Sequence, residues 1–186
     1  TLQEASNCQY FMFFKINIHP KAPLFWYFCT KPVLLINLHD KQFVPYISSD
    51  EIANCIARVA HQINTDYAGK RPLFVAILNG SFMFASDLIK QIDLICEITF
   101  VKFSSYAGIE SSGTVDQLIG FNQDIAGRDV ILVEDIVDTG QTLEKVLNIL
   151  KSKGARSVKI ATLLMKPEVF DKNYPVDYVG KDIPNK

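Results

Sequence analysis

The sequence has few residues of the types that mark metal centres and disulfide scaffolds. It contains four cysteines and three histidines, with no Cys-x-x-Cys pair and no cysteine at metal-ligand spacing from a histidine. Widely spaced cysteines of this kind indicate reduced thiols in a cytoplasmic protein. We assign no catalytic role to the isolated cysteines and histidines, which are Cys8, Cys29, Cys55, Cys96, His19, His39 and His61.

The sequence also lacks an excess of charge of either sign. Nineteen Lys and Arg residues nearly balance twenty Asp and Glu residues, for a formal net charge of -1. Without long basic runs, binding to nucleic acid by bulk electrostatics is disfavoured, and a small-molecule partner is expected. The uncharged stretches are too short to span a bilayer, so we expect no membrane partner.

Residues 1–38 differ from the rest of the chain. They are rich in aromatic residues and are interrupted repeatedly by Lys and Pro. We interpret them as an atypical N-terminal extension of unknown role. The remaining residues, 39–186, are enough for one domain with a well-filled core.

From about residue 43, helical and strand patterns alternate. Apolar residues at positions 52, 56, 59, 63 and 67 predict an amphipathic helix. Continuous apolar runs predict strands buried on both faces, and helical spacing follows two of them. The strands predicted in this way are residues 73–78, 130–135 and 158–165, with a partly alternating strand at 95–103. This order predicts an α/β fold, an open and mainly parallel twisted sheet flanked by helices, with ligands at the carboxyl ends of the strands.

The segment VILVEDIVDTGQTL, residues 130–143, places three carboxylates beside a turn of small residues. Glu134 and Asp135 close a predicted buried strand, Asp138 lies in the turn, and Thr139–Thr142 open a helix. The N–H groups and the partial positive charge of a helix start bind phosphate monoesters. The carboxylates repel phosphate, so they should face ribose hydroxyls or Mg²⁺. A phosphorylated sugar fits both parts.

Two other readings of this segment use the same residues. Asp138 or Thr139 could be an ordinary helix cap, with the adjacent acids as surface charges. A receiver-type phosphoacceptor site also places acids at strand ends.

The whole segment resembles the motif with which type I phosphoribosyltransferases bind phosphoribosyl pyrophosphate (PRPP): a hydrophobic run, two acids, two apolar residues, then D-T-G-x-T. The resemblance covers about residues 39–186 and points to the hypoxanthine(-guanine) branch. It implies a sheet with a small hood region and a purine-salvage enzyme, a homodimer or homotetramer. The implied reaction is Mg²⁺-dependent transfer of 5-phosphoribosyl from PRPP to N9 of hypoxanthine, and of guanine, yielding IMP or GMP and pyrophosphate.

The resemblance also implies roles for the residues of this segment. Asp138 would manage the proton on purine N7, as a general base or hydrogen-bond acceptor. Glu134 and Asp135 would hold the ribose hydroxyls and the metal. The PRPP ribose and phosphate would lie against Glu134, Asp135, Asp138, Thr139, Gly140, Gln141 and Thr142.

Two further segments lie at strand ends. Asn79, Gly80 and Ser81 join a buried strand to a helix; they could be a tight turn with a Ser cap, or expose N–H groups to an anion. They resemble the family's pyrophosphate loop, in which many members have Lys in place of Asn79. Ser105 and Tyr106 lie in a polar stretch that reads as a flexible hairpin and resembles the family's mobile catalytic loop.

Lys166 follows an apolar strand and precedes Pro167. A solvated surface lysine is the common outcome for such a position. It matches the family's lysine that bonds the exocyclic oxygen of a 6-oxopurine, where the amino group of adenine would present donors to a donor. The sequence ends at Lys186, before the family's purine-stacking aromatic residue and its metal-binding L-D-Y segment, and so reads as truncated. A non-catalytic regulator of the same fold that binds nucleotide or PRPP is the alternative.

Overall fold

A computed structural model describes residues 13–15, 36–38, 41–103, 117–120 and 123–185, which fall into two compact units, residues 1–51 and 52–186. In the first unit, three short strands form an antiparallel sheet in the order β1-β3-β2. The strands are β1 (Phe13–Lys15), β2 (Ile36–Leu38) and β3 (Lys41–Pro45). The domain boundary expected at residue 39 falls between β2 and β3 and stays a prediction.

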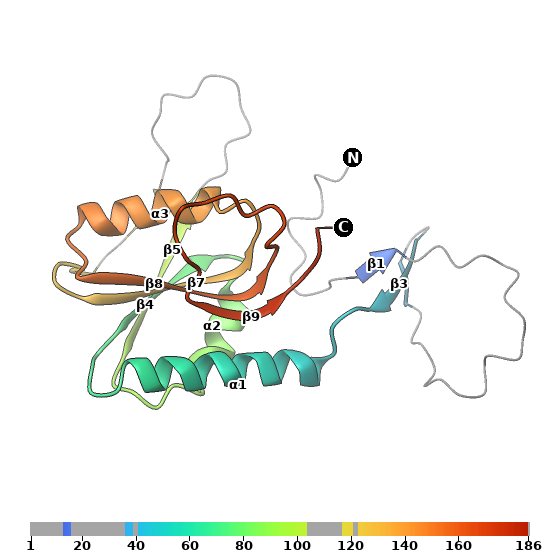
Figure 1. The fold of residues 1–186 in the computed structure, drawn as a ribbon, viewed down its shortest axis with the longest axis horizontal. Helices are drawn as coiled ribbons and strands as arrows, with labels where there is room; N and C mark the ends of the chain where they lie inside the picture. The colour runs from blue at the N-terminus through green and yellow to red at the C-terminus, as the bar shows by residue number, and fades with distance from the viewer. Residues whose placement is uncertain (1–12, 16–35, 39–40, 104–116, 121–122, 186) are drawn as a thin grey trace, which may run out of the picture. The chain divides into compact units, whose positions relative to one another are not determined.

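The second unit is built on a six-stranded sheet in the order β6-β5-β4-β7-β8-β9. Neighbouring strands from β5 to β9 pair in parallel, and β6 pairs antiparallel with β5 at one edge. The strands are β4 (Leu73–Leu78), β5 (Glu97–Phe103), β6 (Gln117–Ile119), β7 (Asp129–Val137), β8 (Ser157–Met165) and β9 (Tyr178–Asp182). The expected open, mainly parallel sheet is confirmed (Figure 1).

Helices cover both faces of this sheet. α1 (Ser49–Asp66) and α2 (Phe82–Ile89) pack on one face, and α3 (Gln141–Ser152) packs on the other (Figure 1). Ser48 caps the start of α1, because its hydroxyl accepts a hydrogen bond from the Glu51 N–H at 3.2 Å. None of the helices in the described part of the chain is long and apolar enough to cross a membrane.

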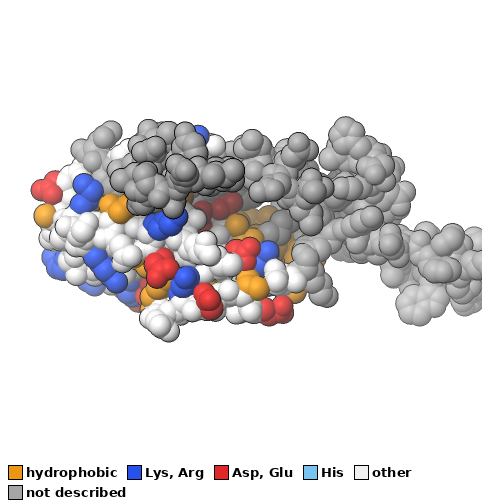
Figure 2. Space-filling view, turned by 90° about the horizontal axis from the view of Figure 1, so that it is seen from above, with side chains coloured by type: hydrophobic (Ala, Val, Ile, Leu, Met, Phe, Trp, Pro, Cys, Tyr) orange, Lys and Arg blue, Asp and Glu red, His pale blue; other side chains and the backbone are white. Residues whose placement is uncertain are grey.

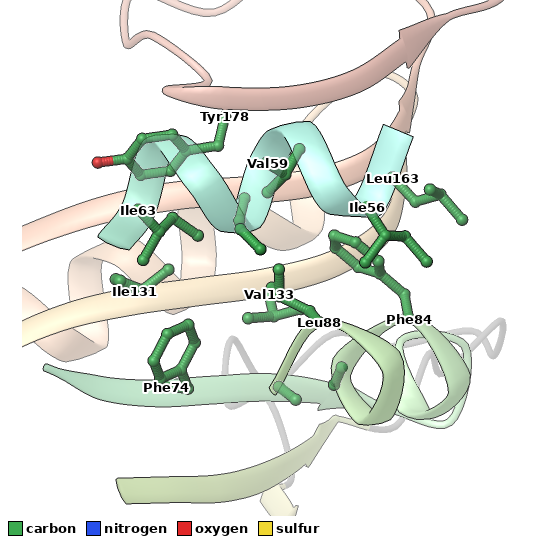
Figure 3. Packing of buried hydrophobic residues seen from close by; sticks show 14 of the residues in the cluster. Ile56, Val59, Ile63, Phe74, Phe84, Leu88, Ile131, Val133, Leu163 and Tyr178 are labelled. Atoms are coloured by element: carbon green, nitrogen blue, oxygen red, sulfur yellow. The ribbon is translucent and has the colours of Figure 1, made fainter. Parts of the chain in front are cut away.

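The core confirms the predicted apolar face of α1. Ile56, Val59 and Ile63 are buried and pack with residues of α2 and of the central strands (Figure 3). A second cluster fills the space between the sheet and α3. Because β4 and the first half of β7 are covered on both faces, β4 is apolar throughout and β7 carries the apolar run 130–133. Cys55 is a buried free thiol, and Cys96 is a half-buried one just before β5.

Two details differ from the sequence prediction. β7 continues to Val137, so Glu134 and Asp135 lie within the strand instead of ending it. Pairing of Ile136 and Val137 with the end of β8 extends the ladder. β9 was not predicted, because Gly180 and Lys181 break the apolar pattern expected of a strand beside a buried one.

Candidate functional site

Three loops that carry predicted site residues follow adjacent strands of the sheet. Asn79 and Gly80 follow β4, the turn Asp138–Gly140 follows β7, and Lys166 follows β8. β7 pairs in parallel with both β4 and β8, so the three loops emerge at the same edge. Ser105 and Tyr106 lie outside the described residues.

The turn after β7 ends at Gly140, which is the N-cap of α3 and has a left-handed backbone, with φ of +77°. Neither Asp138 nor Thr139 caps the helix, so that reading is wrong. Thr139 belongs to the turn, and the helix begins at Gln141. A cavity of about 180 Å³ opens here, lined by Glu134 and by residues 136–143. Uncapped N–H groups at a helix start beside a cavity favour an anion.

Gly140 is enclosed by the segment that follows Lys166. A Cβ at this position would lie 2.8 Å from Phe170 Cε2 and 2.9 Å from the Tyr174 hydroxyl oxygen. The Tyr174 hydroxyl also donates a hydrogen bond to the Gly140 carbonyl at 2.8 Å. Space and backbone conformation both require glycine here.

The acids of β7 lie beside the loop that follows β4. The Asp135 N–H donates to Glu134 Oε1 at 3.1 Å, and burial together with the neighbouring Asp135 carboxyl raises the pKa of Glu134 well above its ordinary value. A Cβ at Gly80 would collide with the Asp135 carboxylate, so glycine permits this close approach. Among the residues that the structure describes, no three His, Cys, Asp or Glu side chains form a metal-binding cluster.

Asp138 and Lys166 form an ion pair, with 3.4 Å between Lys166 Nζ and Asp138 Oδ2. The Lys166 side chain is 20% exposed and that of Asp138 53% exposed, so the pair borders solvent. Lys166 Nζ also lies 3.4 Å from Asn185 Oδ1, and the Lys166 N–H donates to the Val137 carbonyl at 2.8 Å. Two residues assigned separately to the purine base thus lie in direct contact.

In the loop after β4, the Ser81 side chain does not cap α2 as one reading of the sequence expected. The buried Ser81 hydroxyl donates to the Ile77 carbonyl at 2.6 Å and makes no cap hydrogen bond to α2. The peptide bond between Leu78 and Asn79 is cis, and Asn79 is exposed.

The sequence did not predict that Phe170 and Tyr174 enclose the turn after β7, or that Asn185 contacts Lys166. Phe170 and Tyr174 pack edge to face, with ring centroids 5.5 Å apart. Phe170 and Tyr174 follow Lys166 by four and eight positions, and two aromatic residues so close to a predicted site residue were the available signal. Asn185 gave none, because an Asn near Pro reads as a turn residue.

Comparison with known proteins gives consistent matches. A family model described as a phosphoribosyl transferase domain matches residues 48–186. A hypoxanthine-guanine phosphoribosyltransferase of Streptococcus pneumoniae is 45% identical over 141 residues, covering 75% of this chain and 78% of the relative. A crystal structure of a hypoxanthine-guanine phosphoribosyltransferase from Bacillus anthracis is 35% identical with a TM-score of 0.69, covering 76% of this chain and 82% of its own. A hypoxanthine phosphoribosyltransferase structure from Staphylococcus aureus is 38% identical with a TM-score of 0.69, over 84% and 79%.

The enclosure of Gly140 predicts the effect of adding one methyl group. Gly127 is a matched control, because its φ is +71° but a Cβ there would meet nothing within 4 Å. Gly127→Ala should reduce the free energy of unfolding by about 1–2 kcal/mol through backbone strain alone. Gly140→Ala should lose about 1–3 kcal/mol more through steric overlap. Urea unfolding measures both, and equal losses would show that Phe170 and Tyr174 do not confine the turn.

Proposed function

Because this chain belongs to the phosphoribosyltransferase family, in its hypoxanthine-guanine branch, we propose that it catalyses a purine-salvage reaction. The reaction is transfer of the 5-phosphoribosyl group from PRPP to N9 of hypoxanthine, and of guanine, with release of pyrophosphate. The products are IMP and GMP.

The contact between Asp138 and Lys166 carries this proposal. A 6-oxopurine presents its exocyclic O6 and its N7 on one edge, about 3 Å apart. An ammonium group suits O6 and a carboxylate suits a proton on N7, and the two side chains lie 3.4 Å apart. Adenine carries an amino group in place of O6, which would face the Lys166 donor. The pair therefore favours 6-oxopurines.

We assign the other half of the substrate to the turn and to the acids of β7. The 5'-phosphate would bind at residues 138–142, where the cavity meets the start of α3. The ribose hydroxyls are donors, and they suit the Glu134 and Asp135 carboxylates. The loop of Asn79, Gly80 and Ser81 would receive the pyrophosphate, and its Gly80 lies against Asp135. Ser105 and Tyr106 are proposed to close over the reactants and exclude water.

The acidic pair on β7 also suits a divalent cation. Burial and the neighbouring Asp135 carboxyl raise the pKa of Glu134, so ionising both carboxyl groups is unfavourable without a counter-ion. A bound cation would stabilise the ionised pair. Mg²⁺ commonly takes one or two carboxylates and completes its shell with water and substrate phosphates, which fits Glu134 and Asp135 without a third ligand. The ion would offset the charge that develops on the departing pyrophosphate.

We propose that Asp138 handles the proton that purine N7 carries as N9 attacks. The Asp138 side chain is half exposed and its carboxylate contacts Lys166, so a purine bound by Lys166 would lie within reach of both groups. As acceptor, it would take that proton or hold it in a hydrogen bond while the new N9–ribose bond forms. Lys166 would keep the base in register through O6.

We further propose a cytoplasmic homodimer or homotetramer. Cys55 and Cys96 are free thiols, which suits a reducing compartment. Phe82 and Met83 are 48% and 46% exposed at the start of α2, an apolar pair that suits contact with another subunit.

Assays with hypoxanthine, guanine, xanthine and adenine, each with PRPP and Mg²⁺, test the function. We expect IMP and pyrophosphate from hypoxanthine and no turnover of adenine, because Lys166 opposes a 6-amino group. Turnover of adenine alone would reject the assignment. Binding of PRPP without turnover of any purine would favour the regulatory alternative, which no comparison supports.

Asp138→Asn should separate proton transfer from substrate binding. The amide keeps the size of the side chain but is a poor base, so kcat should fall by roughly 10²- to 10³-fold while the dissociation constant for PRPP changes little. Asp87→Asn is the matched control, because Asp87 is a surface residue of α2 that pairs with Lys90 at 2.8 Å. Steady-state kinetics of both variants give the answer, and an undiminished kcat in Asp138→Asn would remove Asp138 from proton transfer.

A further inference from the structure

The segment after β8 contacts Gly140 in the turn after β7, to which we assign the 5'-phosphate. The Tyr174 hydroxyl donates to the Gly140 carbonyl at 2.8 Å, and the Glu144 N–H of the first turn of α3 donates to the same oxygen at 3.0 Å. A carbonyl oxygen has two lone pairs, so both acceptor positions of Gly140 are filled. One of the two donors comes from outside the helix.

The two donors fix the orientation of one peptide plane. In a trans peptide the carbonyl and the following N–H point in opposite directions. Holding the Gly140 carbonyl on the side of Tyr174 and α3 therefore directs the Gln141 N–H to the other side. Gly140 and Gln141 both line the cavity assigned to the 5'-phosphate. Gly140 alone would fix this plane poorly, because glycine has wide backbone freedom.

Tyr174 is itself held in place. The Phe170 ring packs against it at an interplanar angle of 83°. Lys172, between them in sequence, pairs with Glu144 of α3 at 2.9 Å. Burial raises the pKa of Tyr174 to about 12, so the hydroxyl remains a donor at neutral pH.

We propose that Tyr174 is a positioning residue for the 5'-phosphate, which acts through the Gly140 carbonyl to aim the Gln141 N–H at the anion. The proposal rests on the proposed function, which supplies the phosphate ligand. Tyr174 lies eight positions after Lys166, so one segment supports both the turn and the base-binding lysine. Tyr174 lies outside the PRPP motif, which is residues 130–143.

Tyr174→Phe removes the hydroxyl and keeps the ring against Phe170. The dissociation constant of ribose 5-phosphate, measured by calorimetry, should rise roughly three- to tenfold, the effect of one lost neutral hydrogen bond. KM for PRPP should rise with it, while KM for hypoxanthine stays close to wild type and the melting temperature falls by at most a few degrees. Tyr178→Phe is the matched control: it removes a hydroxyl that donates to Asp66 at 2.7 Å, outside the site.

The outcomes distinguish the positioning role of Tyr174 from the proposed function on which it rests. Weaker ribose 5-phosphate binding in Tyr174→Phe, but not in Tyr178→Phe, supports the positioning role. Equal ribose 5-phosphate affinity in wild type and Tyr174→Phe overturns it, while wild-type turnover of hypoxanthine still upholds the proposed function. If KM for hypoxanthine rises as much as the dissociation constant of ribose 5-phosphate, the inference is also overturned, because the substitution then disturbs the whole site and not the turn after β7 alone. A wild-type protein that neither binds ribose 5-phosphate nor turns over hypoxanthine rejects both.

Discussion

Parallel pairing of β7 with β4 on one side and β8 on the other is the constraint on which the site depends. Its register sets Val133 beside Ala76 and Ala161. The loops after the three strands consequently emerge together, although Gly80, Asp138 and Lys166 are far apart in sequence. Burial of these strands between α1 and α2 on one face and α3 on the other keeps that register fixed, since a slip would displace apolar side chains on both faces.

The same register explains how one short segment can carry both acids and a turn to which we assign the 5'-phosphate. Glu134 and Asp135 lie within β7 and approach Gly80, while the turn beyond the strand is enclosed by Phe170 and Tyr174. In the proposed complex, acids and turn contact different parts of one ligand, and repulsion between phosphate and carboxylate is avoided by this separation along the strand.

The sequence predicts those parts of the molecule in which local pattern and burial agree. The apolar runs of β4, β7 and β8 and the spacing of Ile56, Val59 and Ile63 indicated buried strands and an amphipathic helix, as observed. The contact between Asp138 and Lys166 was not predictable from either residue alone, because it follows from the pairing of two strands. β9 was missed because a short edge strand containing Gly180 has little pattern. The contact of Tyr174 with Gly140 was missed because the two aromatic residues of this loop do not by themselves indicate which carbonyl they contact.

Nucleotide binding tests the central claim, that the turn after β7 and Lys166 after β8 recognise opposite ends of one nucleotide. Dissociation constants of IMP, AMP and inosine would be measured for wild type, for Lys166→Ala and for Lys151→Ala, a control in the last turn of α3. Wild type and control should prefer IMP to both other ligands, by about tenfold or more. Lys166→Ala should lose the preference over AMP and keep the preference over inosine, which lacks the phosphate. An unchanged preference for IMP over AMP in Lys166→Ala would contradict the claim.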